Sequence, residues 1–317
     1  MKNIYISGSI AYDEIMDFPG TFQDHFHPEK LHQINVSFVV NKLAKHLGGC
    51  ATNIAYNLRK SLDYISPSSP TPIHLLAAVG KDGNDFLSFF KMNSIDASSV
   101  LVDDSQYTAT GKVITDIKNN QIWGYYYGAC STAKKIALPK GVTKDDFIVL
   151  SATHTDPFLH FQNQAIERGI PYLYDPGMVL TWISDSDLRT GVMHAQYLVG
   201  NDYEIGMIEK RLNMTVKEMT AKGISVITTL GEKGAQFDSM SGFITIPAIK
   251  VGKVVDPTGA GDAWRGGFVA GLAAGYSIKD SLILGNVMGS FAVETVGTVE
   301  HTPSKKEIEE RIRRLKS

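Results

Sequence analysis

The stretch Asp256-Pro257-Thr258-Gly259-Ala260-Gly261-Asp262-Ala263-Trp264 decides how the rest of the chain is interpreted. Its two glycines flank an alanine, a carboxylate follows at once, and apolar residues continue at helical spacing. The pattern predicts a tight loop that enters a helix N-terminus, where unpaired N–H groups and the helix dipole attract an anion such as phosphate. A carboxylate in that place is useful if it accepts a proton from an attacking hydroxyl group. On loop chemistry alone, phosphate binding and an ordinary acidic residue in a first helical turn are equally good interpretations.

The composition is that of a soluble globular protein. The chain has 317 residues, of which 43% are hydrophobic and 20% charged, enough for one large α/β domain or two ordinary ones. Its net charge of −2 provides no basic field, which argues against nucleic acid or an anionic membrane as a partner. Residues 1–8 resemble a short strand rather than a signal peptide, and the uncharged run over 266–278 is too short to cross a bilayer. We therefore expect a cytoplasmic protein.

Alternating strand-like and helical segments predict an α/β fold with a doubly wound, mostly parallel sheet. Polar or glycine-rich residues follow the carboxyl end of each expected strand, which is the edge at which such sheets bind ligands. The expected strands are Lys2–Ser9, Ile73–Val79, Phe147–Leu150, Tyr172–Tyr174, Tyr197–Gly200 and Ile224–Thr229, with a late hairpin of Ala235–Asp238 and Phe243–Ile246.

Two insertions, at about 14–46 and 105–130, do not fit the main sheet. We expect them to form a small β lid on a single domain that spans residues 1–317. The strands expected in these insertions are Asn35–Val40, Lys112–Asp116 and Gln121–Tyr126, the last two as a hairpin.

Aromatic and histidine side chains are concentrated in the two insertions. Phe38 could contact a ligand or a small core. The alternation of Trp123, Tyr125 and Tyr127 places these rings on one face, over a ligand or over a neighbouring strand. A metal site is a minor alternative for the histidines, because their spacing matches no familiar ligand set. They are His25, His27, His32 and His46.

A second glycine pair, Gly48-Gly49, opens an amphipathic helix that carries Asn53 in its first turn. The glycines would let a ligand approach closely, and tight packing of the helix against a strand is the alternative. Asp13 follows the first strand within a few residues, at the edge where ligands bind, and a turn or helix cap is the alternative there. Local chemistry does not separate these alternatives.

Taken together, these motifs resemble the ribokinase (PfkB-type) family of sugar and nucleoside kinases over essentially the whole chain. Within that family the chain looks most like archaeal and bacterial nucleoside kinases, including adenosine kinase-like members. The family signatures are Gly48-Gly49 with Asn53, Asn201 with Glu204, Thr229-Leu230-Gly231 with Lys233-Gly234, and Asp256 to Asp262. The closer likeness involves Tyr174 to Gly177, Gly252 to Asp262 and Ser290 to Glu294.

The resemblance implies a ribokinase-like three-layer α/β/α fold and ATP-dependent phosphorylation of a primary hydroxyl group with Mg²⁺. It assigns Asp262 as the catalytic base. The backbone amides of Gly259, Ala260 and Gly261 would form the anion hole beside it. Phosphoryl transfer mainly requires positioning and charge stabilisation, which fits the chemistry expected of the loop.

The resemblance also implies a nucleotide site along the same sheet edge. Asn201 would lie near the phosphates. Glu204 would act on Mg²⁺ through the water molecules bound to the ion, which suits a cation that keeps part of its hydration shell. Thr229 and Gly231 would contact the phosphates and ribose, and Asn286 would lie near the adenine. Taken alone, residues 201–204 would indicate a helix N-cap followed by acidic residues in the first turn.

For the acceptor, the resemblance implies that Asp13, Gly49 and Asn53 bind sugar hydroxyl groups, while Phe38 and Tyr125 could cover a base. The expected reaction is phosphorylation of the 5′-hydroxyl of an adenosine-type nucleoside, giving the 5′-monophosphate and ADP. A sugar kinase of the ribokinase or fructokinase type is the alternative, and a non-catalytic nucleotide or sugar sensor is a third. A K⁺ ion beside the loop at 256–258 and a homodimer formed through the lid are left open.

Overall fold

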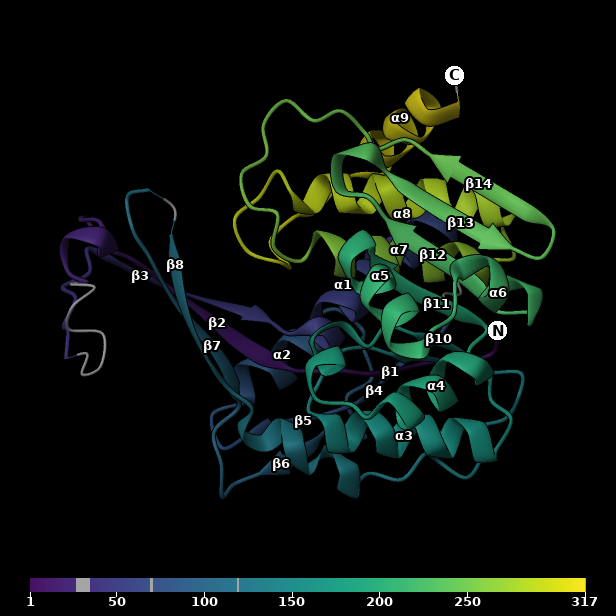
Figure 1. The fold of residues 1–317 in the computed structure, drawn as a ribbon, viewed down its shortest axis with the longest axis horizontal. Helices are drawn as coiled ribbons and strands as arrows, with labels where there is room; N and C mark the ends of the chain where they lie inside the picture. The colour runs from purple at the N-terminus through teal and green to yellow at the C-terminus, as the bar shows by residue number, and fades with distance from the viewer. Residues whose placement is uncertain (27–34, 69–70, 119, 317) are drawn as a thin grey trace.

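The computed structural model describes residues 1–26, 35–68, 71–118 and 120–316. In this part of the chain, eight strands form a central sheet in the order β14-β13-β12-β11-β10-β9-β1-β4, parallel from β12 to β4 and antiparallel at β13 and β14 (Figure 1). This confirms the predicted doubly wound sheet. The strands are β1 Ile4–Ser7, β4 Ile73–Leu76, β9 Phe147–Leu150, β10 Tyr172–Tyr174, β11 Tyr197–Asn201, β12 Ser225–Thr229, β13 Ala235–Ser239 and β14 Gly242–Ile246.

Helices cover both faces of the central sheet and make a three-layer α/β/α structure. Successive side chains of a strand point to opposite faces, so Ile4 and Ile6 enter one core while Tyr5 enters the other. Because both faces are buried, these strands are almost continuously apolar. One layer holds α1 Cys50–Ile65, α2 Asn84–Met92, α7 Ala260–Ala273, α8 Ile278–Ala292 and α9 Lys305–Lys316; the other holds α3 Thr155–Glu167, α4 Asp185–His194, α5 Asp202–Leu212 and α6 Val216–Ala221.

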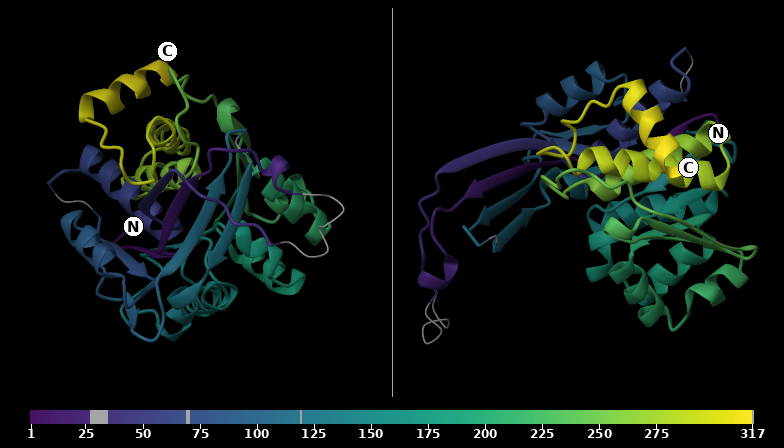
Figure 2. Two further views of the ribbon diagram at one scale, coloured as in Figure 1. Left: turned by 90° about the vertical axis from the view of Figure 1, so that its left-hand side faces the viewer. Right: turned by 90° about the horizontal axis from the view of Figure 1, so that it is seen from above.

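A second sheet projects from the body of the molecule (Figures 1 and 2). Its order is β3-β2-β7-β8, and the chain enters it directly after β1. We call this four-stranded element the small sheet. Its strands are β2 Ala11–Asp17, β3 Lys42–Gly48, β7 Ala109–Thr115 and β8 Gln121–Tyr126.

Three details of the expected strands are wrong. Asn35–Val40 is not a strand: β3 begins at Lys42, where it pairs with Asp17, and the preceding segment contributes Phe38 to an aromatic cluster instead. The strand that opens the first insertion begins at Ala11 rather than near residue 14, so Asp13 lies inside β2 instead of in a turn after β1. The strand expected over 73–79 is divided, because β4 ends at Leu76. The following β5 Ala78–Gly80 pairs with β6 Leu101–Asp103.

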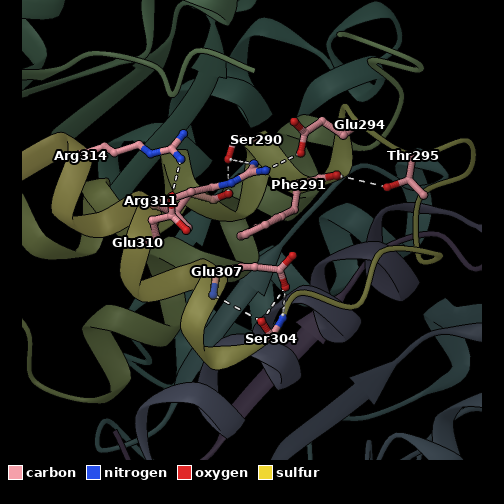
Figure 3. A network of polar contacts seen from close by, with 10 residues as sticks. Ser290, Phe291, Glu294, Thr295, Ser304, Glu307, Glu310, Arg311 and Arg314 are labelled. Atoms are coloured by element: carbon pink, nitrogen blue, oxygen red, sulfur yellow. Dashed lines mark hydrogen bonds and ion pairs between the residues drawn. The ribbon is translucent and has the colours of Figure 1, made fainter. Parts of the chain in front are cut away.

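The C-terminal helix α9 is fastened to the end of α8 (Figure 3). The guanidinium group of Arg311 pairs with Glu294, donates to Ser290 Oγ at 2.7 Å and lies 3.7 Å from the centre of the Phe291 ring. At this end of α8 the carbonyl oxygen of Val293 accepts a hydrogen bond from Val255 N at 2.7 Å. The α8–α9 contact therefore helps to fix the loop that leads into α7. No helix in the described ranges is both long and apolar enough to span a membrane.

The segment between α8 and α9 is held against α1 through His301, which is buried. Tyr56 donates to its carbonyl oxygen at 2.7 Å, and its Nε2 lies 2.7 Å from Asn57 Oδ1. The Asn57 amide group itself donates to Asn53 O, so Asn57 Oδ1 is the acceptor and His301 Nε2 carries the proton. Within the described residues, His301 Nδ1 has no partner. Burial lowers the pKa of His301 to about 4.

Replacing His301 with Gln should make the fold less sensitive to acid. The unfolded chain binds a proton at this residue near pH 6.5, whereas the folded chain resists protonation until about pH 4. Stability is therefore lost as the pH falls through this window, by up to ~1.4 kcal/mol per pH unit. Denaturant unfolding at pH 7 and pH 4.5 measures the loss. It should be smaller in H301Q than in the wild type and unchanged in the exposed control His194→Gln; equal losses in wild type and H301Q would contradict the assignment.

Candidate active site

Two helix N-termini meet at the carboxyl edge of the central sheet, and each begins at a glycine in a conformation that other residues rarely adopt. Gly259 caps α7 with φ of 76°, and a Cβ atom there would lie 2.6 Å from Thr298 Cγ2. Gly49 caps α1 with φ of 87°, and a Cβ atom there would lie 2.5 Å from Ser9 O. Both positions require glycine for conformation and for space.

The first turn of α7 presents backbone amides where the sequence predicts an anion hole. The amide of Ala260 makes only a long contact of 3.3 Å with Pro257 O, and no hydrogen bond within the described ranges occupies the amide of Gly261. The preceding turn is held by Asp256, whose carboxylate accepts from Thr258 N at 2.9 Å and from Gly297 N at 3.3 Å. The N-terminus of α7 can therefore bind an oxyanion through free donors and the helix dipole.

Asp262 lies in this first turn and faces α1. Its Oδ2 accepts a hydrogen bond from Asn53 Nδ2 at 2.8 Å, and Asn53 Oδ1 in turn accepts from Thr298 Oγ1 at 2.7 Å. Burial raises the pKa of the Asp262 carboxyl and the charge of Glu204 adds to this, while Arg265 and Asn53 oppose the rise. A carboxylate with a raised pKa is a stronger proton acceptor, which suits a general base.

Asp13 occupies the same acidic region from the small sheet. Its carboxylate packs against Gly48 so closely that a Cβ atom there would lie 2.2 Å from Asp13 Oδ2. Burial raises the pKa of Asp13 to about 6, with further contributions from Asp262 and Asp256. The structure thus brings Asp13, Gly49, Asn53 and Asp262 together, although they come from three separate stretches of the chain.

The register of the small sheet builds a surface beside Asp13. Asp13 pairs with Gly111 on β7, and Gly111 pairs with Tyr125 on β8, so the three residues face the same side. A Cβ atom on Gly111 would lie 3.4 Å from Asp13 Oδ1 and from the Trp123 ring. Gly111, which sequence reasoning missed, therefore leaves room between a carboxylate and two aromatic rings. Tyr125 also meets Tyr127 edge to face, with ring centres 5.0 Å apart.

Phe38 is not brought to this surface. It packs in an aromatic cluster with Phe18, Phe22, His25 and Phe26, the small-core alternative considered for it, so its contact with a ligand stays a prediction. His27 and His32, considered as metal ligands, lie outside the described residues. Within the described ranges, no group of three or more His, Cys, Asp or Glu side chains is arranged to hold a metal ion.

The expected nucleotide-side residues lie at the ends of β11 and β12. Asn201 is the N-cap of α5: its Oδ1 accepts from Glu204 N and its own N–H donates to Glu204 Oε2, both at 2.8 Å. This is the capping box that the local sequence indicates. Thr229 ends β12 with its hydroxyl 3.4 Å from Gly200 O, and Gly231 follows with φ of 56°. These positions share the edge that holds Asp262, and their contact with a nucleotide stays a prediction.

Asn286 has its hydrogen-bonding groups occupied inside the protein. Its Nδ2 donates to Ile246 O at 3.0 Å and to Pro247 O at 2.8 Å, and its Oδ1 accepts from Trp264 Nε1 at 2.7 Å. It ties α8 to β14 and α7. Any contact of Asn286 with an adenine would therefore have to be made by packing rather than by its amide hydrogens.

Sequence reasoning also missed a buried ion pair next to Asp262. Arg265 on α7 donates through Nη2 to Asp175 Oδ1 at 2.5 Å, and Asp175 lies just past the carboxyl end of β10. The partners are 90 residues apart in the chain, so no local pattern links them. The available signal was a single carboxylate, Asp175, at the end of a buried strand.

The pfkB family carbohydrate kinase model matches residues 10–305 of this chain. The chain belongs to this family. It is 30% identical to a nucleoside kinase of Methanocaldococcus jannaschii over 315 residues. The matched region covers 98% of this chain and 97% of that protein. A ribokinase of Lactococcus lactis is 28% identical over 268 residues, 78% of this chain and 81% of that protein. The structure of Burkholderia thailandensis nucleoside kinase in complex with inosine superposes with a TM-score of 0.85, at 28% identity, over 98% and 97% of the two chains.

As a pfkB family member with this fold, the protein is a phosphotransferase that acts on an alcohol group. Its phosphate donor is ATP, and its acceptor is a small molecule. The predicted fold class, a ribokinase-like α/β structure with a small additional sheet, is confirmed.

Replacing Asp13 with Asn should stabilise the fold at pH 7 while removing most activity. Because the folded-state pKa of about 6 lies above the unfolded value near 3.8, ionised Asp13 costs stability, and this cost appears as the pH rises from about 4 to 6. We expect D13N to gain about 1–3 kcal/mol at pH 7 and little at pH 3.5. Urea unfolding at both pH values measures the gain, with the exposed Asp104→Asn as control. A loss of stability in D13N at pH 7 would contradict the analysis.

Proposed function

We propose that this protein transfers the γ-phosphoryl group of ATP to the 5′-hydroxyl group of an adenosine-type nucleoside, and releases the nucleoside 5′-monophosphate and ADP. The observation that carries the proposal is the meeting of Asp262, the free amides of α7 and Asp13 at one sheet edge. The likeness to nucleoside kinases over nearly the full length of both chains supports a nucleoside as the acceptor.

In the proposed reaction, the acceptor hydroxyl lies between Asp262 and the N-terminus of α7. Asp262 accepts the hydroxyl proton as the oxygen attacks the γ-phosphorus, the new P–O bond forms, and the bond to the β-phosphate oxygen breaks. The amides of Gly259, Ala260 and Gly261 stabilise the negative charge on the transferred group. Asn53 holds the carboxylate in place through its hydrogen bond of 2.8 Å.

Asp13 and the small sheet provide acceptor recognition in this proposal. A buried carboxylate can accept hydrogen bonds from two vicinal hydroxyl groups of a ribose. The space over Gly111 is bordered by Trp123 and Tyr125, whose faces suit a flat base. We further propose that the small sheet closes over the bound acceptor as a lid of a single domain spanning 1–317, which would exclude water and limit ATP hydrolysis.

Mg²⁺ belongs to the same proposal. Glu204 already accepts one backbone hydrogen bond through Oε2, so a metal would be met by its other oxygen or through water. A single carboxylate with retained waters and substrate phosphates is the environment that Mg²⁺ prefers, and Glu204 fits it. Mg²⁺ would neutralise charge on the ATP phosphates. A K⁺ ion beside residues 256–258, a homodimer through the small sheet and a cytoplasmic location also remain proposals.

A panel of acceptors with Mg·ATP tests the choice of substrate. We expect turnover of adenosine or another purine nucleoside, and little turnover of free ribose or fructose, because a free sugar leaves the aromatic surface beside Gly111 uncovered. Coupled ADP release and direct detection of the phosphorylated product provide the measurement. Efficient turnover of a free sugar with none of any nucleoside would favour the sugar kinase alternative, and ATP binding without turnover of any acceptor would favour a sensor.

Replacing Asp262 with Asn should remove the base without removing the anion site. We expect kcat to fall by about 10²–10⁴, the usual contribution of general base catalysis, while ATP affinity changes little. Steady-state kinetics and calorimetric titration with ATP measure the two effects. The exposed Asp104→Asn is the matched control, and wild-type kcat in D262N would rule out the proposed base.

A further inference from the structure

Arg265 lies directly beneath the glycine turn of α7. It follows Gly261 by four residues and Asp262 by three, so the three side-chain positions fall on one side of the helix. A Cβ atom on Gly261 would lie only 2.8 Å from Arg265 Nη1, which puts the guanidinium group against the backbone of the turn. The Arg265 side chain is 8% exposed, so the charge is enclosed by protein.

Burying the ion pair of Arg265 with Asp175 costs free energy. Asp175 is 5% exposed, and the two groups meet at 2.5 Å. Removing two charges from water carries a large desolvation penalty, and apolar residues of similar size often replace such pairs without loss of stability. Moreover, Arg265 Nε has no hydrogen-bond partner among the described residues. Packing and stability therefore give a poor account of why a cation is buried here.

The charges around Asp262 supply a reason. Arg265 carries a positive charge that acts on this carboxyl group, and it opposes the rise in pKa that burial and Glu204 cause. Burial raises the pKa of Asp175 itself, and the charge and hydrogen bond of Arg265 oppose this rise. The groups that face Asp262 or interact with it electrostatically are Asn53 and Cys50 from α1, Asp13 from β2, Asp175 after β10, Glu204 from α5 and Arg265 from α7 itself.

We propose that Arg265, held in place by Asp175, is a positioning residue for phosphoryl transfer: it supports the backbone at Gly261 and offsets the negative charge around Asp262. The inference rests on the proposed function of Asp262 as the base. Without the fixed guanidinium group, the pKa of Asp262 would rise further, and the amides of the turn would lose their support from below.

The test compares three variants in steady-state kinetics across pH. In Arg265→Met combined with Asp175→Asn, both buried charges are removed, so neither is left uncompensated. We expect kcat to fall about tenfold or more, the nucleoside KM to stay within about twofold, and the acid limb of the kcat profile to move up by about one pH unit. Arg265→Lys should retain part of the activity, because it keeps the charge but not the planar group.

Asp175→Asn alone separates anchoring from charge. It keeps the guanidinium group but weakens its hold and removes a nearby negative charge, so kcat should fall while the acid limb does not move upward. The matched control is Arg211→Met with Asp185→Asn, a remote ion pair between α5 and α4, which should keep wild-type kcat and pH profile. Thermal unfolding verifies that each variant is folded. Wild-type kcat and an unmoved acid limb in the double variant would show a merely structural pair and overturn the proposal.

A readout that does not need turnover keeps this test separate from that of the proposed function. If the wild type phosphorylates no acceptor, the proposed function fails, but the Asp262 carboxyl can still be titrated by ¹³C NMR, with Asp262→Asn as the assignment control. A higher pKa of Asp262 in the double variant than in the wild type supports the role of Arg265. An unchanged titration overturns it. If the double variant does not fold, Arg265→Lys is used instead: its kcat should fall because the planar group is lost, and a wild-type kcat in Arg265→Lys would overturn the positioning role.

Discussion

One hydrogen bond, from the Asn53 amide to the Asp262 carboxylate, joins the two helix N-termini on which the active site depends. It can form only because α1 and α7 both begin at glycines with positive φ, which turn the chain sharply at the sheet edge. Thr298 completes the link, since its hydroxyl donates to Asn53 while its methyl group fills the space beside Gly259. The proposed base, the first amides of α7 and the loop that carries Thr298 are therefore positioned as one unit.

This arrangement concentrates negative charge in a partly buried place. Asp262 and Asp256 add to the raised pKa of Asp13, and Glu204 adds to the raised pKa of Asp262. The fold offsets the charge with helix dipoles, with backbone and amide donors, and with the buried Arg265. What remains is a destabilised acidic site, which is the usual relation between stability and function in enzymes. A bound cation and the hydroxyl groups of a substrate would relieve the strain.

The sequence predicts the parts of the site that are encoded locally. The glycine turns, the positions of the central strands along the chain and the helix that follows Gly259 can all be recognised from short patterns. The small sheet is harder, because Lys42–Gly48 carries lysines and a histidine instead of the β-branched residues typical of strands, while the apolar Val-Ser-Phe-Val-Val run before it packs as irregular chain. Gly111 and the Arg265–Asp175 pair depend on register and on contacts across 90 residues, which no local pattern contains.

The proposed mechanism assigns transfer chemistry and acceptor recognition to different parts of the fold. The proposed base and the amides proposed to bind the anion belong to α7, fixed between α1 and α8, whereas Asp13, Gly111 and Tyr125 belong to strands of the small sheet. Because neighbouring residues of a strand face opposite sides, a slip of one residue in that sheet would turn Asp13 away from Tyr125. Substitutions in the small sheet can therefore change the acceptor while the transfer machinery stays intact. Such a division would account for the likeness of this chain to both ribokinases and nucleoside kinases.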